Sequence, residues 1–265
     1  GVEMTREAVG VVGIITPWNF PIAIPAWKVA PALCYGNTVV FKPADLVPGS
    51  SWALADIIIR AGVPSGVFNL VMGSGSVVGQ AIVDHPDVDG LSFTGSQGVG
   101  AGVAAGAVRR QARVQLEMGG KNAAIVFADA DFDAAIEGTM RSAFVNCGQV
   151  CLGTERVYVE RPIFDKFVAA LKKGAEGMTI GLPDDASTGM GPLIGKEHQA
   201  KVLSYYQLAV QEGATVVTGG GVPDMGAALA DGAWIQPTIW TGLPETARVI
   251  KEEIFGPCCH LAPFA

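Results

Sequence analysis

Short runs of β-branched residues alternate with helix-like segments through the first half of the chain. Strand-like runs cover residues 9–15, 38–41, 67–71, 90–93 and 114–116, and helical patterns cover 27–35, 50–61, 75–84 and 97–109. Strands that are apolar throughout need both faces covered, which favours a parallel sheet with crossover helices. The pattern predicts a doubly wound, Rossmann-like α/β domain over residues 1–118.

The same alternation starts again after residue 118. Strand-like runs cover residues 123–127, 156–160, 215–217, 234–240 and 248–250, helical patterns cover 132–144, 163–174 and 197–213, and loop-like stretches cover 182–195 and 219–232. The chain closes on residues 258–265 without a helix or a polar tail, as though cut from something longer. We therefore expect a second α/β domain over residues 119–265, incomplete at its C-terminus.

The composition adds to this picture. Charged residues make up 16% of the 265 residues, against about 25% in ordinary domains. So little charge indicates surface that another segment or subunit covers, and we expect a homo-oligomer. A net charge of -7 argues against a nucleic-acid partner, and the lack of an apolar run of about 18 residues argues against a membrane span.

Five cysteines show neither a zinc-binding spacing nor a disulfide framework, so we expect no metal site and a cytoplasmic location. Cys151 is the best candidate nucleophile. It follows a helix in a Gly-flanked turn, where backbone N–H groups can stabilise negative charge on a reacting atom. A lone cysteine is more often a small buried hydrophobe, which is the alternative. For Cys147, a structural or modulatory role is the better interpretation.

Two further polar residues close apolar strands. Glu117 ends the strand at 114–116 before two glycines, where partial burial can raise the pKa of a carboxyl group toward that of a useful base. The alternative is a solvated carboxylate that pairs with Lys121. Asn19 lies between two prolines, a rigid setting that suits a donor to an oxyanion, or else a turn in which Asn19 caps the following helix.

Two glycine-rich loops are candidates for binding phosphate. The loop at 72–79 resembles G-x-G-x-x-G with one residue too many, and the loop at 93–100 follows a strand and opens a helix. Lys42 and Asp45, after the second strand, offer a cation and a short acid suited to a ribose, or else form a surface ion pair.

Taken together, these segments resemble the aldehyde dehydrogenase superfamily. The motifs PWNFP (17–21), KPAD (42–45), FTGS (93–96), LEMGGK (116–121), GQVC (148–151) and KEEIFGP (251–257) occur in the family's order over nearly the whole chain. Within the superfamily, residues 148–168 are most similar to the hydroxymuconic semialdehyde dehydrogenases of aromatic ring cleavage. Aminomuconic semialdehyde and betaine aldehyde dehydrogenases are relatives.

The resemblance implies a cofactor domain that is incomplete at its N-terminus, a catalytic domain and an NAD(P)-dependent oxidation of an aldehyde through a cysteine thioester. It makes Cys151 the nucleophile, Glu117 the general base, and Asn19, with the backbone N–H of Cys151, the oxyanion hole. The residues that it assigns to cofactor binding are Trp18, Lys42, Asp45, Gly95, Ser96, Glu253 and Phe255. Lys28 matches a family lysine sometimes assigned to a proton relay, and a charged helix end reaching for solvent is the alternative.

The sequence also departs from the family's pattern. Asp45 stands where many NAD-preferring members carry glutamate, so we expect NAD as the cofactor, with NADP as the alternative. Cys258 and Cys259 follow the KEEIFGP motif without a physical explanation in the sequence. Three other functions stay open: a betaine aldehyde-type dehydrogenase, a catalytically idle nucleotide-binding or interaction protein on the same scaffold, and a cofactor-independent cysteine hydrolase.

Overall fold

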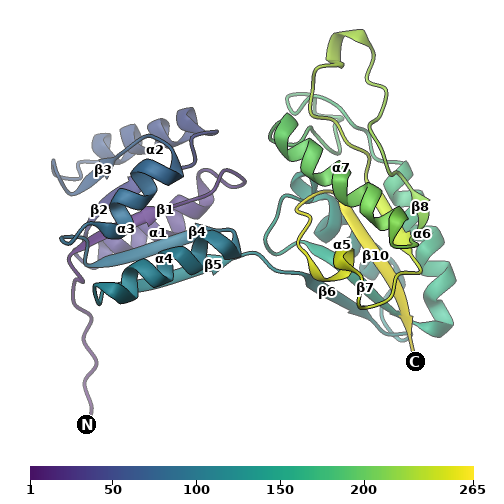
Figure 1. Ribbon diagram of the computed structural model, residues 1–265, viewed down its shortest axis with the longest axis horizontal. Coiled ribbons are helices and arrows are strands. Elements are labelled where there is room, and N and C mark those ends of the chain that lie inside the picture. Colours follow the sequence, from purple (N-terminus) through teal and green to yellow (C-terminus); the bar gives the residue numbers. More distant parts are fainter. The chain divides into compact units, whose positions relative to one another are not determined.

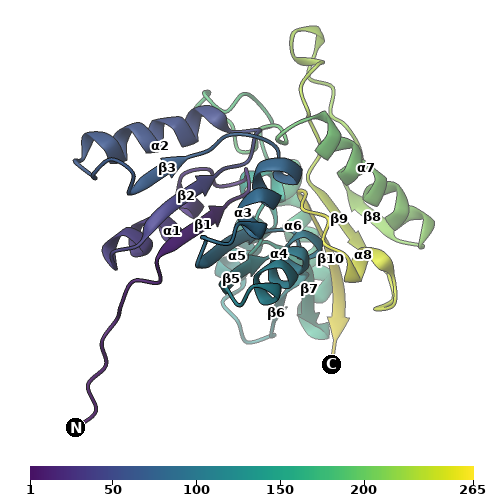
Figure 2. The same cartoon turned by 60° about the vertical axis from the view of Figure 1, so that its left-hand side comes forward.

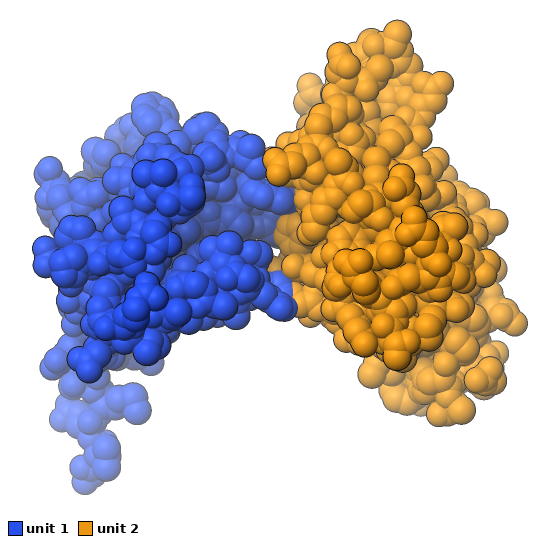
Figure 3. All heavy atoms as spheres, in the orientation of Figure 1, with its two compact units in different colours: residues 1–119 blue, residues 120–265 orange.

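The computed structural model describes residues 1–265. The chain divides into two compact units, Gly1–Gly119 and Gly120–Ala265, coloured separately in Figure 3. None of the helices combines the length and the apolar character that crossing a bilayer requires.

The first unit is a five-stranded parallel sheet with helices on both faces (Figure 1). Its strands are β1 (Val11–Ile15), β2 (Thr38–Lys42), β3 (Phe68–Leu70), β4 (Gly90–Gly95) and β5 (Arg113–Met118), in the order β3-β2-β1-β4-β5. Its helices are α1 (Ala23–Cys34), α2 (Pro48–Arg60), the π-turn η1 (Gly75–Gly79), α3 (Gln80–Asp84) and α4 (Gln97–Arg109). The predicted doubly wound α/β fold is confirmed.

Two successive residues of β1 show how both faces of the sheet are covered. Ile14 packs in a cluster with side chains of α1 and α2, whereas Ile15 packs against the cluster formed by α3 and α4. Because successive side chains of a strand point to opposite faces, the unbroken apolar run is buried on both sides.

The second unit is a mixed five-stranded sheet in the order β6-β7-β10-β9-β8, in which only β8 is antiparallel (Figure 2). Its strands are β6 (Asn122–Val126), β7 (Thr154–Glu160), β8 (Thr215–Thr218), β9 (Thr238–Thr241) and β10 (Cys258–Phe264). Its helices are α5 (Phe132–Phe144), η2 (Val145–Gly148), η3 (Arg161–Ile163), α6 (Phe164–Glu176), α7 (Lys196–Gln211), η4 (Ala227–Leu229) and α8 (Arg248–Lys251).

The central strand β10 accounts for the paired cysteines that the sequence left unexplained. Cys258 and Cys259 are fully buried on opposite faces of this strand, one in the cluster with α7 and α8 and the other in the cluster with α5 and α6. Two successive buried positions are what the middle strand of a sheet covered on both faces requires.

Two strand predictions in the second unit are wrong. Residues 248–250 form helix α8, because the carboxylate of Glu212 accepts the N–H groups of Arg248 and Val249 at 2.9 and 3.1 Å and so caps the helix. The strand predicted over 234–240 is limited to Thr238–Thr241, since Pro237 has no N–H for a ladder and Gln236 N donates instead to Gly221 O.

The buried His260 of β10 makes the stability of the second unit depend on pH. Its Nε2 accepts from Leu243 N at 3.1 Å, and burial lowers the pKa of the imidazole from 6.5 to about 4. As the pH falls below 6.5, the unfolded chain binds a proton that the folded chain refuses until about pH 4. The free energy of unfolding therefore decreases across this window, by about 3 kcal/mol from this group.

Urea unfolding of the wild type and of His260→Gln at a series of pH values measures this contribution. The glutamine amide oxygen can accept the same hydrogen bond but does not titrate, so the variant should lose this part of the acid dependence. The same slope of stability against pH in both proteins would contradict the assignment.

Candidate active site

The turn that carries Cys151 is locked by left-handed backbone. Asn146, Cys147 and Gly148 have φ angles of 51°, 57° and 66°. A Cβ at Gly148 would lie 2.0 Å from the carbonyl oxygen of Gly256, so only glycine allows the turn to pack this closely against the segment before β10. The position of Cys151 thus depends on a long-range backbone contact inside the second unit.

Asn122, the first residue of β6, holds the turn from the other side. Its Nδ2 donates to Cys151 O at 2.7 Å and to Gly153 O at 3.1 Å. Gly153 N donates to Val150 O at 2.8 Å and closes the turn. The backbone around Cys151 is therefore fixed, whereas Cys151 itself is partly exposed.

The other cysteines are poorer candidates for a nucleophile. Cys147 is buried, its thiol donates to Gly191 O at 2.9 Å, and burial raises its pKa to about 12. The predicted structural role of Cys147 therefore fits its surroundings. Burial also raises the pKa of Cys259 to about 12 and that of Cys258 well above its usual value. Cys34 is exposed but ends helix α1, where the helix dipole disfavours a thiolate.

Asn19 follows β1 and is 9% exposed. Helix α1 begins at Ala23, and its N-cap is Ile22, which makes no side-chain capping bond. The alternative interpretation, that Asn19 caps this helix, is therefore wrong. Trp18 beside it is partly buried.

Glu117 lies near the carboxyl end of β5 and is more exposed than expected. The expectation of partial burial was wrong because β5 is an edge strand whose side chains stay largely uncovered. The exposure fits the solvated carboxylate of the alternative interpretation, and within the second unit Lys121 forms a salt bridge with Glu155. The carboxylate Oε1 of Glu117 accepts from Gln115 Nε2 at 3.0 Å.

Lys28 of α1 joins this network. Its Nζ donates to Gln115 Oε1 at 2.8 Å and to Ser92 Oγ at 3.0 Å. The side chain is buried, so the alternative of a charged end reaching for solvent is wrong. Burial lowers the pKa of Lys28 to about 8, and the charge of Glu117 partly opposes this. Lys28, Gln115 and Glu117 thus form a continuous chain of hydrogen bonds.

Removing the charge of Glu117 should lower the pKa of Lys28 further below about 8. The carboxylate stabilises the protonated ammonium, and the neutral amide of Glu117→Gln does not. A carbon-NMR titration of the Lys28 Cε measures this shift. Glu7→Gln removes an exposed carboxylate outside the sheet and should leave the titration unchanged. An unchanged or higher Lys28 pKa in Glu117→Gln would contradict the network.

The residues predicted to bind the cofactor in the first unit follow the carboxyl ends of its strands. Lys42 ends β2, opposite Ile15 of β1, and is 4% exposed, so a mere surface ion pair is excluded. Burial lowers the pKa of Lys42, and the charge of Asp45 partly opposes this. Ser96 is the N-cap of α4 but makes no side-chain capping bond, and it follows Gly95 at the end of β4.

In the second unit the candidate residues lie at the amino ends of the parallel strands instead. Cys151 precedes β7, and Glu253 and Phe255 precede β10, its neighbour in the sheet. Glu253 Oε1 accepts from Gly120 N at 3.3 Å, and burial, with the nearby charge of Glu155, raises the pKa of Glu253.

The structure thus groups the predicted residues within each unit. Trp18, Asn19, Lys42, Asp45, Gly95, Ser96 and Glu117 belong to the first unit, and Cys151, Glu253 and Phe255 belong to the second. The meeting of Cys151 with Asn19 and Glu117 around one carbonyl stays a prediction.

Sequence reasoning missed Gln115 and Glu155. Glu155 is 8% exposed at the start of β7, where it forms the salt bridge with Lys121 and accepts backbone N–H groups of residues 254 and 255. A carboxylate among the buried positions of an otherwise apolar strand is the signal that could have found it. Gln115 carries no such signal.

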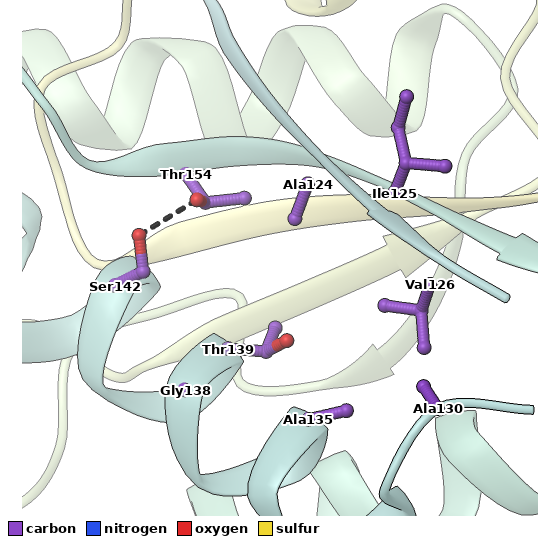
Figure 4. Close-up of a pocket in the computed structure, with 9 residues that line it drawn as sticks. All are labelled: Ala124, Ile125, Val126, Ala130, Ala135, Gly138, Thr139, Ser142 and Thr154. Carbon is purple, nitrogen blue, oxygen red and sulfur yellow. Dashed lines mark hydrogen bonds between the residues drawn. The ribbon is translucent and has the colours of Figure 1, made fainter.

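A cavity of about 330 Å³ between β6 and α5 is lined by none of these residues (Figure 4). Its lining residues are Ala124, Ile125, Val126, Ala130, Ala135, Gly138, Thr139, Ser142 and Thr154. The hydroxyl groups of Ser142 and Thr154 bond to each other at 2.7 Å. Because no titratable side chain lines the cavity, no general acid or base is available there, and its hydroxyl groups have no base that could activate them as nucleophiles. No cluster of three or more histidine, cysteine, aspartate or glutamate side chains could hold a metal ion.

Comparison with known proteins identifies relatives over nearly the whole chain. A sequence model described as "Aldehyde dehydrogenase family" matches residues 2–265. A 2-hydroxymuconic semialdehyde dehydrogenase of Pseudomonas sp. (strain CF600) is 58% identical over 260 residues, which cover 98% of this chain and 54% of the relative. A 2-aminomuconic 6-semialdehyde dehydrogenase of Pseudomonas sp. is 50% identical over 260 residues, 98% of this chain and 53% of the relative.

A solved structure extends the similarity to the fold. The crystal structure of a betaine aldehyde dehydrogenase from Staphylococcus aureus in complex with NAD⁺ matches with a TM-score of 0.95 at 39% identity. The match covers 97% of this chain and 51% of that one. The chain spans about half the length of the curated relatives that it matches.

Proposed function

This chain belongs to the aldehyde dehydrogenase family, and on that premise we propose that the intact protein oxidises an aldehyde to a carboxylic acid with NAD⁺. The overall reaction consumes the aldehyde, NAD⁺ and one water, and it yields the acid, NADH and a proton. The observation that carries the proposal is the family match over residues 2–265, which includes both Cys151 and Glu117.

Cys151 forms the covalent bond to the substrate. Its thiolate adds to the aldehyde carbon, and the carbonyl oxygen takes up the negative charge. The amide of Asn19 and the backbone N–H of Cys151 donate hydrogen bonds to this oxygen. The rigid turn of residues 146–153 supports this role, because a fixed N–H needs no reorganisation as charge develops.

The residues of the first unit fit a dinucleotide. Lys42 places a nearly buried ammonium at the carboxyl edge of the sheet, where doubly wound folds bind nucleotides. Ser96 opens α4 with a hydroxyl that the helix does not use as a cap, beside N–H groups suited to a pyrophosphate. Lys42 and Asp45 would hold the adenosine ribose, and Gly95, Ser96 and Trp18 lie along the same edge.

In the second unit, Glu253 would hold the nicotinamide ribose and Phe255 would contact the ring. NAD⁺ in this position supplies the acceptor for the hydride that leaves the substrate carbon, which converts the cysteine adduct to a thioester. The carboxylate of Asp45 favours NAD⁺ over NADP⁺, but this acid is shorter than the usual glutamate and leaves room near the 2′ position, so the selection is a preference only.

Glu117 completes the reaction as the general base. Its carboxylate takes a proton from water, which then attacks the thioester carbon and releases the acid and the Cys151 thiolate. Gln115 orients the carboxylate from one side, and Lys28 contributes positive charge through Gln115. A glutamate at this position favours hydrolysis of the thioester.

We propose 2-hydroxymuconic semialdehyde, a product of aromatic ring cleavage, as the substrate. The relative named for this activity is 58% identical to the chain, against 50% for one named for 2-aminomuconic 6-semialdehyde and 44% for a betaine aldehyde dehydrogenase of Sinorhizobium fredii.

Exposed apolar side chains support a homo-oligomer, and the thiols support a cytoplasmic location. Trp27, Trp52 and Ile125 are 67%, 65% and 61% exposed, and a homo-oligomer would cover such side chains. Cys34, Cys147, Cys258 and Cys259 are free thiols, which fits the reducing conditions of the cytoplasm.

The test is NADH formation by the intact protein with three aldehydes: 2-hydroxymuconic semialdehyde, 2-aminomuconic semialdehyde and betaine aldehyde. We expect the highest kcat/KM with the first, and no activity when NAD⁺ is omitted. A higher kcat/KM with betaine aldehyde would overturn the substrate assignment. Absence of NADH with all three aldehydes would favour a catalytically idle scaffold. Cleavage of a thioester at the same rate with and without NAD⁺ would favour a cysteine hydrolase.

A further inference from the structure

The loop before β10 has a backbone that needs support. Phe255 has a φ of 62°, in the left-handed region that a residue with a side chain rarely adopts. With Ile254 it presents two consecutive N–H groups, an arrangement that binds anions. The flanking side chains are the two that the proposed function assigns to the nicotinamide ribose and ring. The shape of this loop therefore bears on the proposed cofactor site.

The carboxylate of Glu155 occupies this pair of N–H groups. Its Oε1 accepts from Phe255 N at 2.9 Å and from Ile254 N at 3.1 Å, and its Oε2 also accepts from Ile254 N at 3.1 Å. Glu155 enters from β7, four residues after Cys151 in the chain. An anion supplied by the protein itself thus stabilises the strained loop.

Lys121 neutralises this carboxylate. Its Nζ forms a salt bridge with Glu155 Oε2, and both side chains are less than one-tenth exposed. Lys121 O in turn accepts from Arg156 Nε at 2.9 Å, so strand β7 holds the lysine at its backbone as well. Removing only one partner of such a buried ion pair is strongly destabilising, because the other charge is left buried and unpaired.

A second bond fixes the other end of the loop. Glu253 Oε1 accepts from Gly120 N, the residue before Lys121. His198 Nε2 and Phe255 O lie 2.7 Å apart within hydrogen-bond distance. The two side chains assigned to the cofactor are thus held by a connected network of contacts, which joins residues 120–121, Glu155 and residues 253–255.

From this arrangement we infer that Glu155 is a positioning residue for the nicotinamide half of the cofactor. It does not contact the reacting atoms. It acts through the backbone of Ile254 and Phe255, which it holds in the conformation that presents Glu253 and Phe255. This inference rests on the proposed function, because the roles of Glu253 and Phe255 come from there.

The test compares the binding of NAD⁺ and of ADP to the intact wild-type protein and to Glu155→Gln by isothermal titration calorimetry. The amide keeps the size of the side chain but loses the charge that pairs with Lys121 and one acceptor oxygen. We expect the Kd for NAD⁺ to rise about tenfold, as for the loss of a preorganised contact. The Kd for ADP should stay unchanged, since ADP lacks the nicotinamide half.

Glu160→Gln is the matched control. Glu160 also lies on β7 and accepts a backbone N–H, that of Ala128 at 2.5 Å, but it is at the far end of the strand. The Glu160→Gln variant should bind both NAD⁺ and ADP with the Kd values of the wild type. A thermal melt of each variant checks folding, and the more drastic Glu155→Ala should weaken NAD⁺ binding further wherever it folds.

The outcomes separate the two proposals. Equal weakening of ADP and NAD⁺ in Glu155→Gln, or no weakening of either, would overturn the positioning role while wild-type aldehyde oxidation still supports the proposed function. A wild-type protein that binds no NAD⁺ and oxidises no aldehyde would overturn the proposed function and this inference with it.

Discussion

Replacing Cys151 with serine should lower kcat for aldehyde oxidation by about 10⁴-fold or more, the scale on which loss of a nucleophile acts. The serine hydroxyl keeps nearly the same shape, but it is not ionised at neutral pH and cannot form the thioester. The turn should survive the change, because its bonds run through the backbone of residues 150–153 and through Asn122. NADH formation measures the loss, and NAD⁺ binding should remain.

Two other cysteines provide the controls. Cys34→Ser changes an exposed thiol at the end of α1 and should leave kcat as in the wild type. Cys147→Ser replaces a buried thiol with a more polar hydroxyl, which costs more to remove from water even if it still donates to Gly191 O. The variant should therefore be less stable, while activity persists in the folded fraction. Loss of activity in Cys34→Ser equal to that in Cys151→Ser, or substantial activity in Cys151→Ser, would contradict the assignment of the nucleophile.

Replacing Glu117 with glutamine should separate the two halves of the reaction. The thioester should still form, with about one NADH for each active site, but its hydrolysis should slow by about 10²- to 10⁴-fold because water lacks a general base. Rapid mixing with excess aldehyde and NAD⁺ should therefore show a burst of NADH followed by a slow steady state. Glutamine preserves the hydrogen-bonding shape, so a folding defect is not expected at this exposed position.

Glu7→Gln is the control, because Glu7 is an exposed carboxylate outside the sheet. This variant should oxidise the aldehyde without a burst of NADH. The prediction fails for Glu117 if the variant forms NADH linearly at the wild-type rate. It also fails if the first turnover slows as much as the steady state, because that would place Glu117 in the formation of the thioester rather than in its hydrolysis.

Local patterns were sufficient where the local signals were strong. The helices predicted over 97–109 and 132–144 coincide with α4 and α5. For α5 the reason is visible, since Asp131 caps the helix by accepting from Ala134 N at 3.0 Å. The parallel order of the first sheet follows from apolar strands separated by helices.

Elements that depend on distant partners could not be predicted in this way. Residues 248–250 are β-branched enough to resemble a strand, and the cap that makes them a helix comes from Glu212, far away in the sequence. Strand β10 lies in the middle of its sheet although its sequence suggested only a chain end. Its two buried cysteines acquire a role once both faces are packed.

In the candidate site, too, residues in local motifs could be predicted, whereas residues positioned by distant contacts could not. The ordered motifs indicated Cys151, Glu117 and Asn19 from the sequence, and the structure supplies the rigid turn of the first of these. The burial of Lys28 was not expected, because it results from contacts with Ser92 and Gln115 on neighbouring strands. Glu155 escaped notice because its partners are backbone N–H groups about a hundred residues later, which no local motif reveals.

The central claim is that Cys151 carries the acyl group between oxidation and hydrolysis. The most direct measurement is mass spectrometry of the intact Glu117→Gln protein, quenched in acid after mixing with NAD⁺ and 2-hydroxymuconic semialdehyde, and then digested. The account predicts that the peptide containing Cys151 gains the mass of the acyl group, and that hydroxylamine removes it. An unmodified Cys151 peptide at a time when NADH has formed, or the acyl mass on a different residue, would contradict it.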